Sequence, residues 1–256
     1  NRLDTFGTGY NALPESIVLD AAGDVFVGQA GGTADLPRFD GGGQLRATYD
    51  VPLERRGSDW IDLAIDQCTM YYTSEGSSIK RYDVCADTAL PDLTSGLTEA
   101  YALRILPGGQ GVLVADTTTI QLVDNVVGGG IQRIYDAPGQ DCWFALNLDP
   151  DGTSFWSADF CTSMVYKFDI ASGTVLQSFS TGTSTNTVFG LVVNGEFSDA
   201  RNREGKRLGE TAVLETVVRL RGEPTTRILE EVLAVVERFA GDEPRPDDQT
   251  LVLLRS

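Results

Sequence analysis

Asp116 and Asp159 occupy the same place in consecutive repeats of this sequence, each just before a predicted turn, and Glu75 lies near that place in the preceding repeat. Converging carboxylates could bind Ca²⁺ or another divalent metal, because a hard cation prefers about six to eight oxygen ligands. Aspartate also caps turns by accepting hydrogen bonds from nearby backbone amides, and we favour this alternative. The metal site is therefore the weaker interpretation of Asp116 and Asp159.

A second group of side chains could contact a ligand directly. It combines aromatic rings with carboxylates near the starts of predicted strands: Glu15, Trp60, Asp62, Tyr101, Trp143 and Phe144. Amphipathic rings provide affinity, and a few carboxylates orient a bound molecule. The alternative, which we favour, is that these residues pack between neighbouring sheets.

The composition excludes several kinds of chemistry. The 256 residues include no histidine, which removes the commonest general base and excludes Ser-His-Asp and Cys-His catalysis. The formal net charge of −17 makes nucleic acid and anionic membranes poor partners, since binding to phosphates requires Lys and Arg. No apolar run approaches the ~20 residues of a membrane-spanning helix. Any catalytic metal would have to be held by carboxylates.

The elements that must position these residues recur along the chain. A hydrophobic residue followed by aspartate occurs as Phe39-Asp40, Tyr82-Asp83, Val123-Asp124 and Phe168-Asp169, at spacings of 43, 41 and 45 residues. Each repeat contains four apolar segments separated by turn residues; in the last repeat these are 143–148, 155–158, 165–168 and 175–179. Four-stranded sheets repeated every ~40–50 residues are typical of a β-propeller. We interpret the repeated aspartates as turn residues.

The predicted fold is therefore mainly β, with a propeller over residues 1–196. Four full blades are expected over residues 13–58, 59–99, 100–141 and 142–186. Residues 3–7 resemble the last strand of a blade, and residues 188–193 resemble a lone first strand. Propellers usually close by combining strands from both ends in one blade, but here the two middle strands are missing. Either the chain lacks blades that its relatives possess, or the C-terminal tail or another subunit covers the open edge, which includes self-association.

Two segments carry a resemblance to a known family. Residues 13–27, which read LPESIVLDAAGDVFV, and residues 148–152, which read LDPDG, resemble NHL-type propeller repeats of secreted bacterial proteins. The resemblance implies a ring that usually has six blades and most often serves as a binding scaffold. Some propellers of this kind are lyases or lactonases with a metal or a histidine near the channel.

The four cysteines form two candidate pairs. Cys68 and Cys85 flank one predicted hairpin, and Cys142 and Cys161 flank another, so that each pair is expected to face across two antiparallel strands. Such opposed residues are close enough for a disulfide. Free thiols are the alternative, and a zinc site is less favoured because the sequence has no C-x-x-C spacing. Disulfides predict an extracellular or cell-surface location.

From about residue 197 the composition changes. Residues 224–240 carry apolar side chains at helical spacing (Leu229, Val232, Leu233, Val236, Phe239), residues 210–220 show a weaker version, and residues 251–254 read as a short strand. Phe197 to Gly205, Leu208-Gly209 and Asp247 to Arg255 resemble the C-terminal part of PPM-type serine/threonine phosphatases of bacterial sigma-factor cascades. The resemblance implies a metal-binding role for Asp247 and Asp248, and by itself it would suggest a cytoplasmic protein.

The earlier metal-binding segments of that phosphatase family are absent, and one carboxylate pair cannot hold two metal ions ~3.5–4 Å apart. The sequence therefore predicts a non-enzymatic binding or scaffold propeller fused to an inactive phosphatase-derived tail. Its partner would be a protein, a small molecule or a glycan. Two alternatives stay open: a carboxylate–metal enzyme at the channel using Glu15 or Asp62, and a module whose tail helices bind a partner or complete the ring.

Overall fold

Four antiparallel sheets, each of four strands, make up most of the computed structural model. The structure describes residues 6–8, 13–191, 202–204, 206, 208, 210–220, 223 and 225–241. Blade 1 contains β1 (Pro14–Leu19), β2 (Val25–Gln29), β3 (Leu36–Phe39) and β4 (Leu45–Tyr49). Blade 2 contains β5 (Ile61–Leu63), β6 (Thr69–Tyr72), β7 (Ser78–Asp83) and β8 (Thr88–Ser95).

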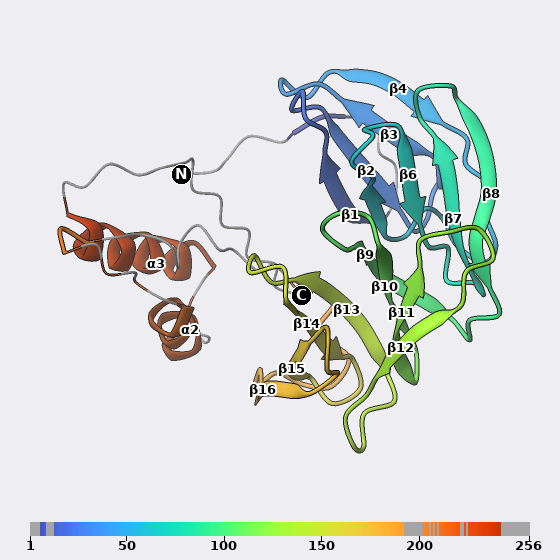
Figure 1. Ribbon diagram of the computed structural model, residues 1–256. Helices are drawn as coiled ribbons and strands as arrows, with labels where there is room; N and C mark the ends of the chain where they lie inside the picture. Colours follow the sequence, from blue (N-terminus) through green and yellow to red (C-terminus); the bar gives the residue numbers. More distant parts are fainter. Residues whose placement is uncertain are drawn as a thin grey trace.

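The other two sheets repeat this plan. Blade 3 contains β9 (Ala100–Ile105), β10 (Gly111–Asp116), β11 (Thr119–Asp124) and β12 (Ile131–Tyr135). Blade 4 contains β13 (Trp143–Leu148), β14 (Ser154–Asp159), β15 (Met164–Asp169) and β16 (Val175–Ser180). In every blade the strands pair in chain order, and the first strands β1, β5, β9 and β13 contact one another in succession (Figure 1). The propeller with four full blades is confirmed.

Asp40, Asp83 and Asp169 stabilise the turns after the third strands, whereas Asp124 accepts a hydrogen bond from the Gln132 side chain. Asp40 accepts hydrogen bonds from the amides of Gly42 and Gln44, and these bonds lower the pKa of its carboxyl. Asp169 accepts from the amide and the hydroxyl of Ser172 in the same way. A carboxylate that binds turn amides fixes where one strand ends and the next begins. The periodic Asp therefore marks the turn between the third and fourth strands.

The cores lie between blades. One cluster joins Phe26 and Leu36 of blade 1 to Ile61 and Met70 of blade 2, all at most 1% exposed. A larger cluster joins blades 2, 3 and 4 through residues such as Leu103. β10 and β14 are buried along their whole length. β10 lies between blades 2 and 4, and β14 lies between blade 3 and the segment that contains Val188.

The first strand of blade 2 is short, and one strand prediction is corrected. β5 ends at Leu63, and Ile65 is 87% exposed in the turn that follows. Asp66 ends the strand there because its carboxylate accepts hydrogen bonds from the amides of Cys68 and Thr69. Residues 188–191, the described part of the expected lone strand, are not in a strand. Leu191 nevertheless accepts a hydrogen bond at its carbonyl from the Asn147 side chain of β13.

The C-terminal part contains α2 (Glu210–Arg219) and α3 (Thr225–Ala240). They pack on each other through a cluster of Leu220, Ile228, Val232 and Val236. Val232 and Val236 are buried, as predicted. Leu233, also predicted for the buried face, is 38% exposed, because the buried face runs along Ile228, Val232 and Val236. Gly241 ends α3 with a φ of 61°. Asp247, Asp248 and residues 251–254 lie outside the described residues.

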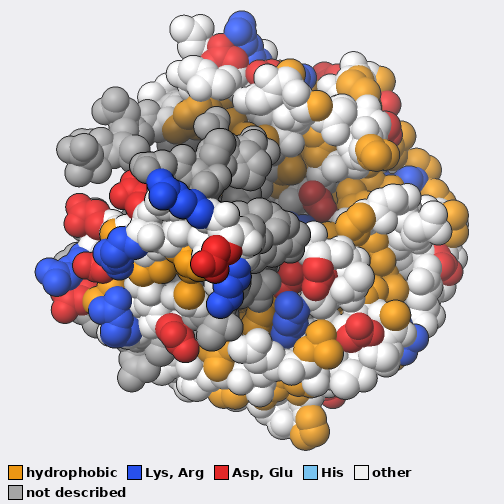
Figure 2. All heavy atoms as spheres, turned by 60° about the vertical axis from the view of Figure 1, so that its left-hand side comes forward, with side chains coloured by type: hydrophobic (Ala, Val, Ile, Leu, Met, Phe, Trp, Pro, Cys, Tyr) orange, Lys and Arg blue, Asp and Glu red, His pale blue; other side chains and the backbone are white. Residues whose placement is uncertain are grey.

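The surface differs between the two parts. Figure 2 shows Lys and Arg side chains concentrated over the helical part, and hydrophobic side chains spread over the propeller. Within the part of the chain that the structure describes, none of the helices has the length and apolar character needed to cross a membrane.

Candidate functional site at the inner rim

The starts of the four first strands form one end of the channel, which we call the inner rim. The turns that follow these strands close with the same backbone hydrogen bond, donated to the carbonyls of Asp20, Ala64, Leu106 and Asp149. Counting back five residues from each carbonyl gives the equivalent rim positions, which are Glu15, Asp59, Tyr101 and Phe144. The rim therefore has an acidic half on blades 1 and 2, and an aromatic half on blades 3 and 4.

The acidic half is organised around Asp59. Its backbone is fixed on both sides, since its amide donates to the Thr73 carbonyl at 3.0 Å and its carbonyl accepts from the Ser16 hydroxyl at 2.7 Å. Arg56 lies over the carboxylates, 2.8 Å from Glu75 and 3.8 Å from Glu15. One guanidinium thus serves two carboxylates, while Asp59 is 1% exposed beneath them.

Burial raises the pKa of the Asp59 carboxyl to about 8, and its hydrogen bond to Glu15 and the charges of Glu15 and Glu75 add to this rise. Arg56 opposes the rise. A buried carboxyl beside other carboxylates does not ionise readily, so the Asp59 carboxyl keeps its proton near neutral pH. The Oδ1 atom of Asp59 is buried without a hydrogen-bond partner among the described residues.

The aromatic half is a cluster of four rings. Tyr101 lies 4.7 Å from Phe144 between ring centroids, and Phe144 lies 5.3 Å from Phe160. Phe189 packs edge-on against both phenylalanines, 5.9 Å from Phe144 and 5.0 Å from Phe160, and is 49% exposed. Burial raises the pKa of the Tyr101 phenol well above its usual value, and a hydrogen bond to Glu99 adds to this. The phenol therefore stays protonated and links the rings to the acidic side chains.

A second ring of polar side chains lies three residues further along the strands. Asp62 accepts a hydrogen bond at 2.8 Å from the Ile105 amide of the next blade. Arg104 donates to Asn147 at 3.0 Å, and Asn147 donates to the Leu191 carbonyl at 3.1 Å. Asp62 and Arg104 thus reach the inner strand of the next blade, and Asn147 reaches the segment 188–191. These contacts tie the blades together around the channel.

The predicted ligand-binding residues lie in three different places. Glu15 and Tyr101 lie at the rim, whereas Asp62 belongs to the second ring. Trp60 is 6% exposed, with Arg104 over its ring at 5.6 Å, and Trp143 is fully buried and donates from Nε1 to Asp136. For these two tryptophans the packing alternative describes the structure.

Sequence reasoning missed four residues of the rim, which are Arg56, Asp59, Phe160 and Phe189. Asp59 lies three residues before Asp62, and the apolar pattern alone does not show which of the two lies at the height of Glu15. The signal that could have found Asp59 is the turn position, since counting back from each turn aligns the repeats. Phe160 and Phe189 lie in loops, where the repeat gives no alignment.

Asp116 and Asp159 cap turns at the rim end of the second strands. Asp116 accepts from the amides of Thr98 and Glu99 at 2.7 and 2.8 Å, and from the Gln121 side chain. Asp159 accepts from the amides of Cys142 and Thr162, each at 2.8 Å. These bonds occupy the carboxylate oxygens with protein donors, which for Asp159 include its own turn and for Asp116 lie in the loop before β9 and on β11.

Both predicted disulfides are confirmed. The bridge between Cys68 and Cys85 has a Cα–Cα distance of 5.2 Å, and that between Cys142 and Cys161 one of 5.6 Å. The cysteines are not directly opposed, however: the Cys68 carbonyl accepts from the Val84 amide, and the Cys142 carbonyl accepts from the Phe160 amide. Each bridge therefore joins a cysteine to the residue that follows its directly opposed partner on the other strand.

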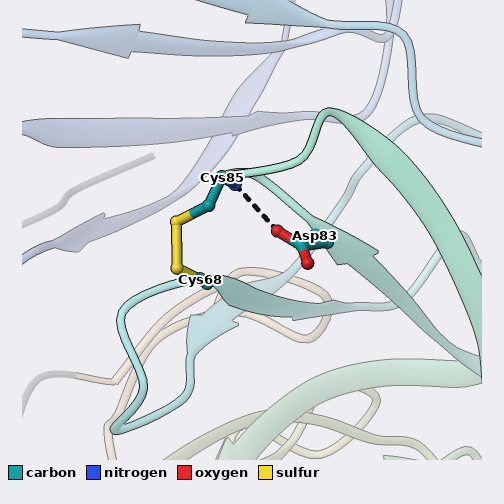
Figure 3. A group of neighbouring side chains, drawn as sticks. All are labelled: Cys68, Asp83 and Cys85. Carbon is teal, nitrogen blue, oxygen red and sulfur yellow. Dashed lines mark hydrogen bonds between the residues drawn. A yellow bond between two sulfur atoms is a disulfide. The ribbon is translucent and has the colours of Figure 1, made fainter.

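Each disulfide has a carboxylate beside it. Asp83 accepts from the Cys85 amide at 2.9 Å (Figure 3), and Asp159 holds the Cys142 amide in the equivalent role. These are also the groups of described residues whose donor atoms lie close enough to surround a metal ion. With the sulfurs joined to each other, the thiolates that would bind a soft metal are not available. We interpret both groups as structural.

Comparison with solved structures identifies similar folds. One is described as Kuenenia stuttgartiensis hydrazine synthase, with 16% sequence identity and a TM-score of 0.57, covering 73% of this chain and 54% of that chain. This chain thus spans about half the length of that structure, and at this identity the likeness shows the fold alone. No family model and no curated protein matches the sequence, so the NHL type and the phosphatase resemblance stay predictions.

Proposed function

We propose that this protein is a non-enzymatic binding or scaffold propeller of the extracellular space or the cell surface, with its ligand surface at the inner rim. The observation that carries the proposal is the aromatic half, where Tyr101, Phe144, Phe160 and the half-exposed Phe189 form one cluster. Exposed aromatic groups beside polar side chains are characteristic of binding surfaces for proteins and glycans. The two disulfides support an oxidising compartment.

The acidic half defines what the ligand presents next to its apolar surface. Glu15 and Glu75 are partly exposed, and Arg56 between them leaves the group anionic overall. Hydroxyl or amine donors on the ligand would pair with these carboxylates, while a sugar ring or an apolar side chain stacks on the phenylalanines.

The C-terminal part is proposed to be an inactive fragment derived from a PPM-type phosphatase. Its support is the sequence resemblance and the observation that α2 and α3 bury their apolar faces against each other. Since the resembling segments include only one carboxylate pair, Asp247 and Asp248, two-metal hydrolysis is not expected of it.

The alternative hypothesis is that the protein is a carboxylate–metal lyase or lactonase that acts at the channel. Such an enzyme would require Glu15 or Asp62 as metal ligands, but Arg56 lies beside Glu15, and Arg104 acts on the Asp62 charge. Glu15 has Asp59 and Glu75 beside it, but among the described residues the donor atoms of these carboxylates, like those around Asp62, do not lie close enough together to surround a metal ion. We therefore favour the binding propeller.

The proposal is tested by binding of the purified protein to an array of extracellular glycans and to a panel of immobilised secreted proteins. We expect saturable binding that falls at least ten-fold in Phe189→Ala. The matched control is Leu176→Ala, because Leu176 is 54% exposed but lies on the outer strand β16. Equal loss in both variants, or a stoichiometric divalent metal together with turnover of a lactone or polyuronate, would contradict it.

A further inference from the structure

The acidic half of the inner rim has more carboxyl groups than positive charges. Arg56 lies 2.8 Å from Glu75 and 3.8 Å from Glu15, and its charge also acts on the Asp59 carboxyl. Among the described residues, three carboxyl groups thus face one guanidinium. The group can therefore pair with a further cation from outside the chain.

The buried carboxyl of Asp59 is an independent indication of a ligand. Its residue is 1% exposed, its side chain forms a hydrogen bond to Glu15, and its Oδ1 atom has no hydrogen-bond partner among the described residues. A buried acceptor that has lost its contact with water and gained no donor costs free energy. A cation bound at Glu15 and Glu75 would offset part of this cost, because it would lie beside the same carboxyl.

The carboxyl groups of the acidic half suit an organic cation better than a metal ion. A divalent metal prefers about six to eight oxygen ligands, and among the described residues the donor atoms of these carboxylates do not lie close enough together to surround one. An ammonium or guanidinium group instead donates a few directed hydrogen bonds, which one or two carboxylates can accept. A basic side chain therefore fits this place.

The acidic and aromatic halves meet at Tyr101. Its phenol forms a hydrogen bond to Glu99, which pairs with Arg55 at 2.6 Å, and the charge of Glu75 acts on the same phenol. The ring of Tyr101 lies 4.7 Å from that of Phe144 between centroids. A basic side chain at Glu75 would thus lie next to aromatic rings, which attract both cations and apolar groups.

The aromatic half favours a polypeptide over a sugar. The side chains of Phe144, Phe160 and Phe189 have no hydrogen-bonding groups, and the Tyr101 phenol is already bonded to Glu99. A sugar has hydroxyl groups around its ring, so burial against these phenylalanines would leave some of them without partners. An apolar side chain of a peptide does not have this cost.

We propose that the inner rim binds a segment of a partner protein that presents a lysine or arginine side chain next to a large apolar side chain. The basic group pairs with Glu15 and Glu75, and the apolar group packs against Phe144 and Phe189. The formal net charge of −17 attracts such a segment over a longer distance. This inference rests on the proposed binding function and names the class of its ligand.

Binding of the basic side chain is coupled to the proton of Asp59. The charged groups that face Asp59 are Glu15 from β1, Arg56 from the loop before β5 and Glu75 from the turn between β6 and β7. A positive charge added beside the two glutamates favours the ionised form of Asp59, so the complex releases this proton. Since the pKa of Asp59 is about 8 without the ligand, affinity rises as the pH approaches this value from below.

The test is isothermal titration calorimetry of the full chain with a short capped peptide that contains lysine followed by phenylalanine. Two matched peptides have norleucine in place of the lysine, or alanine in place of the phenylalanine. We expect the lysine–phenylalanine peptide to bind about ten-fold more tightly than either one at low salt, and high salt to reduce its advantage over the norleucine peptide. Its dissociation constant should fall about two-fold or more between about pH 6 and pH 8, with release of a proton to the buffer.

Three variants locate the effect. Glu15→Gln is expected to weaken binding of the lysine–phenylalanine peptide about five-fold, and Asp59→Asn to remove the pH dependence. The matched control is Glu230→Gln, which makes the same change of charge at an exposed position of α3 and should bind like the wild type. Circular dichroism shows that each variant is folded before it is compared.

Equal affinity for the lysine and norleucine peptides overturns the inference, as does equal weakening by Glu15→Gln and Glu230→Gln. An affinity that does not change with pH contradicts the coupling to Asp59. If both peptides bind alike and Phe189→Ala weakens both, the rim remains the ligand surface and only the inference about the basic group is wrong. Binding of glycans alone on the array also overturns the inference and leaves the proposed function standing. If neither the peptides nor any glycan or secreted protein binds, both proposals fail.

Discussion

The inner rim and the layer two residues beneath it differ although they lie on the same four strands. At the rim, the equivalent positions are Glu15, Asp59, Tyr101 and Phe144, four different residues with different chemistry. Beneath it they are Ile17, Ile61, Leu103 and Leu146, all aliphatic and buried except in blade 1. Packing between blades fixes the lower layer, whereas solvent on one side leaves the rim free to vary. The comparison separates the residues that make the propeller from those available for binding.

The largest expected effect lies in the lower layer. Leu103→Ala removes a fully buried side chain from the cluster shared by three blades. We expect a loss of about 2–5 kcal/mol in the free energy of unfolding, because the surrounding blades cannot collapse into the cavity. Urea unfolding followed by circular dichroism measures the change. A loss no larger than that of a surface substitution would remove the distinction between the two layers.

Removing each disulfide tests whether the two ends of the channel contribute equally to the stability of the propeller. Cys142 and Cys161 close a sequence separation of 19 at the rim end, and Cys68 and Cys85 one of 17 at the far end. Loops of this length predict that each bridge contributes about 3 kcal/mol. Replacing either pair by serine should lower the midpoint of urea unfolding by similar amounts. A much smaller effect at one end would show that its hairpin is held by its other contacts.

The comparison also explains how much could be predicted from sequence. The blades were predictable because Phe39-Asp40 and its repeats combine an interblade side chain with a turn cap, and both are required by the fold. Both cysteine pairs followed from hairpin geometry, although the bridges span a diagonal. Asp59 was missed because a rim position has no periodic signal of its own. It becomes visible only when the hydrogen bonds of the turns align the strands.

The conformation of the segment that covers the outer side of blade 4 could not be predicted, for a related reason. Residues 188–191 have the apolar character of a first strand, but no strand among the described residues pairs with them, and they lie against blade 4 without forming one. A strand needs a partner for its backbone groups as well as an apolar face. Sequence pattern reports the face, whereas the partner depends on what the rest of the chain supplies.

The acidic half predicts a pH dependence of stability. The pKa of Asp59 is about 8 in the folded protein and close to 4 when unfolded, so the folded state binds the proton more tightly. Its contribution is therefore complete below about pH 4 and is lost as the pH rises through about 8. Asp59→Asn should remove this dependence, so its stability relative to the wild type rises with pH between about pH 5 and 8. Urea unfolding across this range measures it, and parallel curves for the two proteins would contradict the assignment.

The smallest effect on stability is expected at the aromatic half. Phe189 is 49% exposed, and its contacts with Phe144 and Phe160 are edge-on, so Phe189→Ala leaves the interblade clusters intact. We expect a change within about 0.5 kcal/mol in the free energy of unfolding, as for other surface substitutions. Thermal unfolding of Phe189→Ala and Leu103→Ala under the same conditions compares the stability effect at the rim with that in the buried layer. If Phe189→Ala destabilises the protein as strongly as Leu103→Ala, the aromatic cluster is part of the core, and its exposure does not indicate a ligand surface.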